Sequence, residues 1–212
     1  MTDLNAEEYW QLIHAERARL ADILENLSDD EWRANTLCSD WTVEQVVAHL
    51  TAGANTGLLT WLLSMLRAGF NPAKHNERRL VHHLGSTPAE TLANFRDSIT
   101  STTAPTKDYP AWLGEVIVHG QDIARPLGLA LEPDPAAVGE VARFYAAKDF
   151  AVNSKKLVNG LKIEAKDASF QHGNGPRVRG NLLDLVMSMA GRPGYIQTLE
   201  GDGVDELRRR IT

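Results

Sequence analysis

The sequence lacks the features that mark several common classes of protein. It holds one cysteine, Cys38, among 212 residues, so no disulfide can form within the chain and a reducing cytoplasm is expected. The N-terminal stretch MTDLNAEEYW has neither a basic region nor an apolar core, so we expect no signal peptide. The most apolar run, Gly57 to Leu66, is much shorter than the roughly twenty residues of a membrane span. These shortages favour a soluble, cytoplasmic protein.

Basic charge is also scarce. The formal net charge is −6, with 22 Lys and Arg against 28 Asp and Glu, whereas a nucleic-acid-binding protein normally presents a basic face. The one compact basic run, Arg208–Arg210, ends a predicted helix, where it complements the helix dipole. We therefore expect no nucleic-acid or membrane partner, and the sequence leaves the oligomeric state open.

The chain does contain a succession of helical patterns. Apolar residues at three-and-four spacing, capping signals and helix-ending Pro and Gly residues mark the elements. Thr42 with Gln45 forms a capping-box pattern that starts a long second helix. Between the second and third helices lies a polar loop with Gly69 and Pro72. Helices are predicted over residues 5–26, 42–66, 86–100, 108–125 and 135–153.

The pattern changes after about residue 160. Leu161, Ile163 and Ala165 alternate with polar residues, which predicts a strand. A turn, a short extended piece and two further helices follow. We therefore predict an α+β, mainly α fold: an up-down four-helix bundle at residues 1–132, then a linking helix and a small α+β unit at residues 133–212.

The stretch WLGEVIVHGQDIARPLG places charged residues in an apolar setting. Glu115 and His119 are four residues apart, so on a helix they share one face. His49 lies in an equally apolar stretch of the second helix. One carboxylate and two imidazoles on facing helices form a three-ligand metal site with an open fourth position, as in catalytic zinc centres. The spacing alone also allows a plain ion pair and a hydrogen-bonded core histidine.

Three blocks of sequence together resemble a known family. They are CSDWTVEQVVAHL, GEVIVHGQDIARPLG and GPRVRGNLLDLVMSMAGR, and they are similar to the mycothiol-dependent maleylpyruvate isomerase family. That family belongs to the DinB-like metal-binding four-helix bundles and carries a C-terminal sterol-carrier-like unit. By this resemblance, the zinc ligands are His49, Glu115 and His119, and mycothiol is the thiol cosubstrate. The C-terminal unit of this chain looks short beside a full sterol-carrier-like domain, which leaves closure of the site and the acceptor open.

The resemblance implies a zinc-dependent isomerase or S-transferase. Coordination keeps a low-molecular-weight thiol as a thiolate, which attacks a small electrophile. Two other classes remain open: a non-catalytic metal- or ligand-binding protein of regulation or stress, and a metal-assisted hydrolase. The sequence does not identify the acceptor, the native metal or the thiol.

Further residues are candidates around the metal. Asp122, three residues after His119, is predicted to orient an imidazole N–H, with an ion pair to Arg125 as the alternative. By resemblance to the family, Arg192 is the candidate catalytic arginine for an anionic substrate. Cys38 precedes the second helix, and we interpret it as a structural residue. The alternative arginines are Arg78, Arg79, Arg177 and Arg179.

Overall fold

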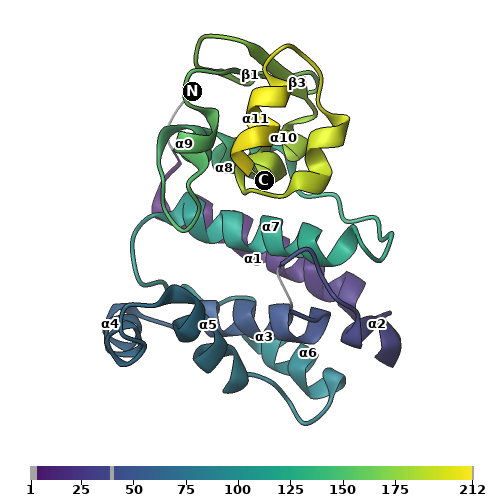
Figure 1. Cartoon of the computed structure of the whole chain (residues 1–212). Coiled ribbons are helices and arrows are strands. Elements are labelled where there is room, and N and C mark those ends of the chain that lie inside the picture. The colour runs from purple at the N-terminus through teal and green to yellow at the C-terminus, as the bar shows by residue number, and fades with distance from the viewer. Residues whose placement is uncertain (1–3, 39–40, 212) are drawn as a thin grey trace. The chain divides into compact units, whose positions relative to one another are not determined.

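A computed structural model describes residues 4–38 and 41–211, which divide into two compact units, 1–132 and 133–212 (Figure 1). The described part of the first unit contains helices and no strand, and the second unit adds a small sheet to its helices. The mainly α, α+β fold class predicted from the sequence is confirmed.

Four helices of the first unit pack in a ring. Helices α1 and α3 each contact both α6 and α7, so each member touches two others, as Figure 1 shows for α1 and α7. Buried apolar side chains from this ring, among them Leu20, Val46, Phe95 and Ile123, form one core cluster. In chain order the elements are α1 (Ala6–Leu24), α2 (Asp29–Arg33), α3 (Val43–Ala54), α4 (Leu58–Arg67), α5 (Pro72–Val81), α6 (Pro88–Asp97) and α7 (Tyr109–Ala124).

The prediction of one long second helix over residues 42–66 is wrong, because the helix is interrupted between α3 and α4. Thr56 Oγ1 donates to the Ala52 carbonyl at 2.6 Å, and Asn55 Nδ2 donates to the Thr51 carbonyl at 2.9 Å. These side chains compete with the helical backbone, and α4 then begins at Leu58, with Gly57 at its N-cap. None of the α4 residues is buried. Within the described residues, no helix has the length and apolar character needed to cross a membrane.

The predicted polar loop after residue 66 is also wrong in part, because it contains α5. Asn71 caps this helix by accepting a hydrogen bond from the Lys74 backbone N–H at 3.1 Å, and Pro72 occupies its first turn. Both are standard helix-start signals. Helix α5 packs against α3, so it flanks the helix that carries His49.

The second unit is built around a three-stranded sheet of order β2-β1-β3. Strand β1 pairs antiparallel with β2 and parallel with β3, and α10 packs against α8. Helix α8 ends at Ala147, six residues before its predicted end. The elements are α8 (Pro135–Ala147), α9 (Ser154–Val158), β1 (Lys162–Ala165), β2 (Gln171–His172), β3 (Arg177–Gly180), α10 (Leu182–Met189), the 3₁₀-helix η1 (Pro193–Thr198) and α11 (Val204–Ile211).

Candidate metal centre

Helix α3 positions His49. Thr42 accepts a hydrogen bond from the Gln45 backbone N–H, and the Gln45 side chain accepts one from the Thr42 backbone N–H, so the predicted capping box is present. This fixes where the helix begins. Val46 and Leu50 lie in the core, while the neighbouring His49 side chain stays 14% exposed. His49 is thus held at the edge of the core rather than inside it.

Helix α7 positions Glu115 and His119. Its β-branched run is compatible with a strand, but it forms the predicted helix, of 16 residues, with Pro110 in the first turn and Asp108 at an N-cap that lacks a side-chain capping hydrogen bond. Nearly every residue of α7 from Leu113 onward is buried. Glu115 keeps a 30% exposed side chain and His119 a 10% exposed one, so the carboxylate has access to solvent.

The two helices bring His49, Glu115 and His119 together. Nε2 of His49 lies 3.3 Å from Oε2 of Glu115, and Nε2 of His119 lies 3.4 Å from the same oxygen. The two imidazole rings meet edge to face, with centroids 5.1 Å apart. One ligand atom from each residue lies within 4.8 Å of the others.

These separations match the donor set of a tetrahedral zinc site. Zn–N and Zn–O bonds of 2.0–2.2 Å give ligand–ligand edges of about 3.3–3.6 Å. A charge-assisted hydrogen bond is shorter, at about 2.7–2.9 Å. Two imidazole nitrogens and one carboxylate oxygen therefore fit a divalent metal in chemistry, and the two separations from Glu115 fit it in spacing. Their role as metal ligands stays a prediction.

Asp122 lies behind His119. Its Oδ2 accepts a hydrogen bond from Nδ1 of His119 at 3.0 Å, and its side chain is fully buried. This contact keeps the proton on Nδ1, so in the neutral imidazole it is the lone pair of Nε2 that faces Glu115. A carboxylate behind a histidine is the usual support of a metal-bound imidazole.

The same contacts set the charges of the metal-free site. Burial alone would raise the pKa of Glu115, but hydrogen bonds from His119 and His49 and their charges hold it far below its usual range. Burial alone would lower the pKa of His119, but hydrogen bonds with Asp122, Cys38 and Glu115 raise it well above its usual value. The metal-free site thus holds a carboxylate beside a protonated imidazole.

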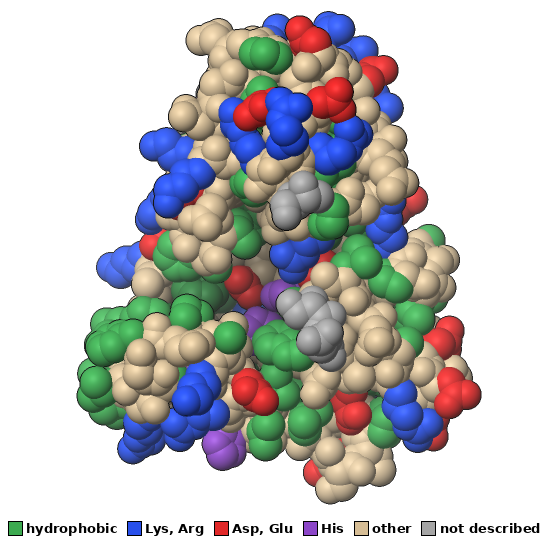
Figure 2. Space-filling model, viewed as in Figure 1, with side chains coloured by type: hydrophobic (Ala, Val, Ile, Leu, Met, Phe, Trp, Pro, Cys, Tyr) green, Lys and Arg blue, Asp and Glu red, His purple; other side chains and the backbone are tan. Residues whose placement is uncertain are grey.

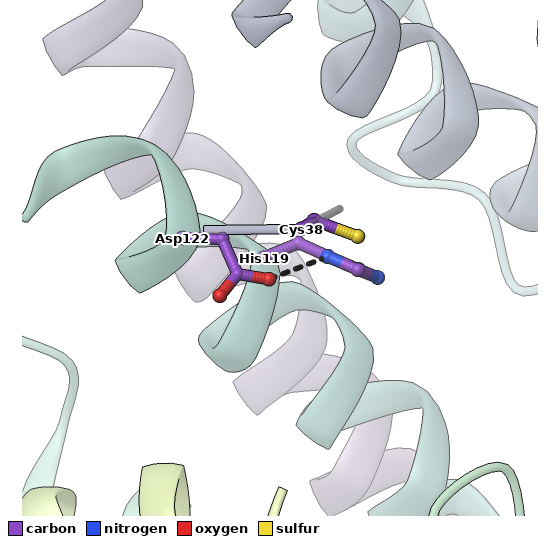
Figure 3. Close-up of side chains that lie close together, drawn as sticks. All are labelled: Cys38, His119 and Asp122. Carbon is purple, nitrogen blue, oxygen red and sulfur yellow. Dashed lines mark hydrogen bonds and ion pairs between the residues drawn. The ribbon is translucent and has the colours of Figure 1, made fainter. Parts of the chain in front are cut away.

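Cys38 lies beside His119 and Asp122, as Figure 3 shows. The Leu37 backbone N–H donates to the Asp122 carbonyl at 3.0 Å, which ties this part of the chain to α7. The thiol is free and half-buried. The sequence interpretation of Cys38 as structural did not anticipate this contact, because a loop rather than a helix makes it.

Two further side chains near His49 did not stand out as partners in the sequence. The Trp41 ring lies 5.0 Å from the His49 ring, measured between centroids. His75, on α5, is buried, and its pKa is lowered by burial and by the charges of Arg79 and His49. A signal for His75 exists in the sequence, because its i, i+4 spacing to Arg79 would place both on one face of α5.

Two of the predicted arginines of the second unit are engaged within it. Nη1 of Arg192 donates to the Ala190 carbonyl at 2.8 Å. Arg179 forms ion pairs with Glu164 and Glu200. Because Arg192 belongs to residues 133–212 and the metal ligands to residues 1–132, its catalytic role stays a prediction.

The fold of the chain is similar to that of known proteins. Two crystal structures of a mycothiol-dependent maleylpyruvate isomerase, one of them a histidine-to-alanine variant, share the fold. Their TM-scores are 0.66 and 0.65, their identities 17% and 16%, and the matches cover 95% of this chain and 96% of each relative. A search of curated proteins finds no significant match.

The sequence also matches a protein-family model. The mycothiol maleylpyruvate isomerase N-terminal domain matches residues 13–112, a range that includes His49 and ends before Glu115. The predicted resemblance is confirmed, and the proteins that the chain resembles are isomerases, which are enzymes. Residues 13–112, just under half of the chain, are thus similar to the mycothiol maleylpyruvate isomerase N-terminal domain.

Proposed function

We propose that the chain is a metal-dependent, thiol-using isomerase or S-transferase. His49, Glu115 and His119 would hold a divalent metal, Zn²⁺ by its preference for such ligands. Mycothiol or a similar low-molecular-weight thiol would be the cosubstrate, and a small electrophile the acceptor. The observation that carries the proposal is the pair of 3.3 and 3.4 Å separations around one oxygen of Glu115.

The number of protein ligands supports catalysis over a structural role. Among the described residues, His49, Glu115 and His119 form a candidate metal-binding group with three protein ligands. Structural zinc sites are closed by four protein ligands, whereas catalytic sites keep one position for water or substrate. A bound divalent metal supplies the positive charge that keeps a thiol deprotonated at neutral pH.

The residues of the chain divide the remaining work. The hydrogen bond from His119 to Asp122 fixes the orientation of the imidazole ring. Nε2 of His119 therefore already points toward the proposed metal position. Apolar neighbours on α7, such as Val116 and Ile117, are almost fully buried and exclude water from the protein side of the site. Glu115, partly exposed, marks the side from which a thiol would enter.

Isomerisation then needs no net change in atoms or charge. The thiolate forms a C–S bond to one carbon of a conjugated cis double bond, and the electron pair moves onto the adjacent carbonyl. Rotation about the resulting single bond is followed by return of the electron pair and loss of the thiolate, which gives the trans product. An acceptor that cannot eliminate would retain the thiol, and the same site would then act as an S-transferase.

The substrate would be anionic if it resembles maleylpyruvate, the compound named for the structural relatives. Arg192 remains our proposal for a residue that binds such an anion. A chemistry that depends on a reduced low-molecular-weight thiol fits a cytoplasmic location.

The test combines metal analysis with thiol binding. Purified full-length protein is analysed for bound metal and titrated calorimetrically with mycothiol. We expect one divalent metal per chain, and thiol binding that disappears in His49→Ala. His172→Ala is the matched control, because His172 is exposed on β2.

Turnover separates the candidate classes. Conversion of maleylpyruvate or another cis conjugated acid that requires added thiol supports the isomerase, and a stable thiol adduct supports the transferase. Metal binding without thiol binding would overturn the proposal in favour of a metal-binding regulatory protein. Hydrolysis that proceeds without thiol would overturn it in favour of a metal-assisted hydrolase.

A further inference from the structure

Helices α4 and α5 gather three arginines around one pocket. Arg67 ends α4, while Arg78 and Arg79 lie on the last turns of α5. These three arginines and His82 line the pocket together with Leu63 and the hydroxyl-bearing Thr60 and Ser64. Figure 2 shows Lys and Arg side chains gathered beside the hydrophobic side chains of α4.

These arginines differ from others in the same unit. Arg19, Arg33 and Arg96 each form an ion pair with a carboxylate. Among the residues that the structure describes, no carboxylate lies within ion-pair distance of Arg67, Arg78 or Arg79. Three neighbouring guanidinium groups without a carboxylate partner repel one another. Such a cluster is typical of a site that receives its negative charge from a ligand.

Arg79 supplies a second, independent observation. One arm of its guanidinium is anchored, because Nη2 donates to Thr56 Oγ1 at 2.8 Å. Its Nε is buried and, among the described residues, has no hydrogen-bond partner. An unsatisfied buried donor normally costs about 1–3 kcal/mol. Arg79 is therefore held in a fixed orientation with a donor left unused.

Arg78 is also held by the backbone. Its Nη1 donates to the Arg67 carbonyl at 3.2 Å, at the end of α4. The only acidic residue of α5, Glu77, is exposed and forms no ion pair with these arginines. The two anchored guanidinium groups keep their remaining N–H donors, and a planar fork of such donors matches the oxygens of a carboxylate or a phosphate.

We propose that this pocket binds the carboxylate or phosphate group of a small organic anion, at a site separate from the metal centre. The pocket volume is about 150 Å³, comparable with a cavity that holds one benzene molecule. The size therefore selects a small molecule, with the arginines on its charged group and the two hydroxyls as further hydrogen-bond partners.

The site is distinct from the metal ligands. Thr56, which anchors Arg79, comes seven residues after His49 and lies beyond the end of α3 at Ala54. None of the pocket residues belongs to the group of His49, Glu115 and His119. The inference does not depend on the proposed function.

Calorimetric titration tests the site. Full-length protein at low salt is titrated separately with succinate and with inorganic phosphate, and tighter binding of one identifies the preferred group. We expect Arg78→Gln to weaken binding about tenfold or more, because a hydrogen bond to a charged group is lost. Arg67→Gln is a second variant, since its side chain makes no hydrogen bond within the described residues and its loss should not disturb folding.

Two controls make the result decisive. Arg96→Gln removes the same charge from an ion-paired arginine on α6 and should leave anion affinity unchanged. His49→Ala should also leave it unchanged, even where it abolishes metal and thiol binding. Equal affinity in the Arg78→Gln and Arg67→Gln proteins, no binding of either anion, or loss of binding only in His49→Ala would overturn the proposal.

Discussion

Oδ2 of Asp122 accepts a hydrogen bond from Nδ1 of His119 at 3.0 Å, from within a fully buried side chain. The bond joins residues three positions apart on α7, so one helix supplies both the imidazole and the group that orients it. Glu115 lies one turn before His119, on the other side of its ring. The ligand pair of α7 is therefore assembled by helix geometry alone.

Replacing Asp122 with Asn should weaken metal binding. The amide keeps the shape but loses the negative charge that fixes the His119 tautomer and raises its basicity. We expect a fall in metal affinity of about 10- to 100-fold, measured by competition with a chelating dye. Asp97→Asn, at the exposed end of α6, should bind metal like the wild type. Wild-type affinity in Asp122→Asn would contradict the orienting role.

Metal affinity should rise with pH through the neutral range. The pKa of His119 is raised well above its usual value in the metal-free protein, and a ligand histidine must be neutral to bind metal. A proton therefore competes with the metal at pH values above ~6.5, where an ordinary histidine is already neutral. Zinc dissociation constants measured from pH 5.5 to 8.5 should not level off near 6.5.

The metal-free protein should respond to pH in two directions. The raised pKa of His119 contributes stability that is present below ~6.5 and is lost as the pH rises through the folded-state value. The lowered pKa of Glu115 contributes stability that is present above ~4.3 and is lost at lower pH. Urea denaturation of chelator-treated protein should find this contribution greatest between about pH 4.3 and 6.5, and smaller in Glu115→Gln, where Asp122 still raises the pKa of His119.

Arg17 should matter for stability rather than for chemistry. Its buried Nη1 donates to the carbonyls of Ser98, Ile99 and Ser101, which joins α1 to the chain that follows α6. Burial lowers its pKa to about 10. Arg17→Met should lower the free energy of unfolding by about 2–5 kcal/mol, because buried carbonyls lose their donor.

The control for Arg17 is an exposed arginine. Arg33 pairs with Asp29 and Asp30 at the surface, and Arg33→Met should change the free energy of unfolding by less than about 1 kcal/mol. Denaturation midpoints in urea check both values. Equal losses in the two variants would contradict the role given to Arg17.

Gly201 should be hard to replace in the second unit. Its φ is +116°, and an added Cβ would meet the Arg177 carbonyl oxygen at 2.2 Å, a backbone atom that cannot move aside. Gly201→Ala should therefore destabilise the protein by at least about 1–3 kcal/mol. Gly194→Ala, with nothing within 4 Å of its added Cβ, should be close to neutral. Thermal melting of the two variants provides the comparison.

The local signals of the sequence were sufficient for much of the fold. The capping box at Thr42 and Pro110 in the first turn of α7 both mark helices that the structure contains. Once α7 is set, the 3.6-residue period places Glu115 and His119 on one face. His49 comes from another helix, so spacing alone left other interpretations open, and the resemblance to the family supplied the full set of three ligands, whose role remains to be tested.

The misjudged elements depend on competition that periodicity does not capture. The apolar pattern continues past Gly57, yet Asn55 and Thr56 divert hydrogen bonds from the helix and end α3. Helix α5 has few apolar residues, so the segment was predicted as a polar loop even though Asn71 and Pro72 are typical of a helix start. The contact of Cys38 with His119 arises through a loop anchored at Asp122, and no spacing rule predicts it.

The gap in sequence between the two halves of the metal centre affects the order of assembly. Glu115 and His119 become neighbours as soon as α7 forms, whereas His49 comes from 66 positions before Glu115. Formation of a helix takes about a microsecond or less, and closing a long loop is slower and entropically costly. We therefore expect α7 to capture a metal first with two ligands. His49 could bind the metal only after α3 has packed against α7. The bound ion would then link the two helices.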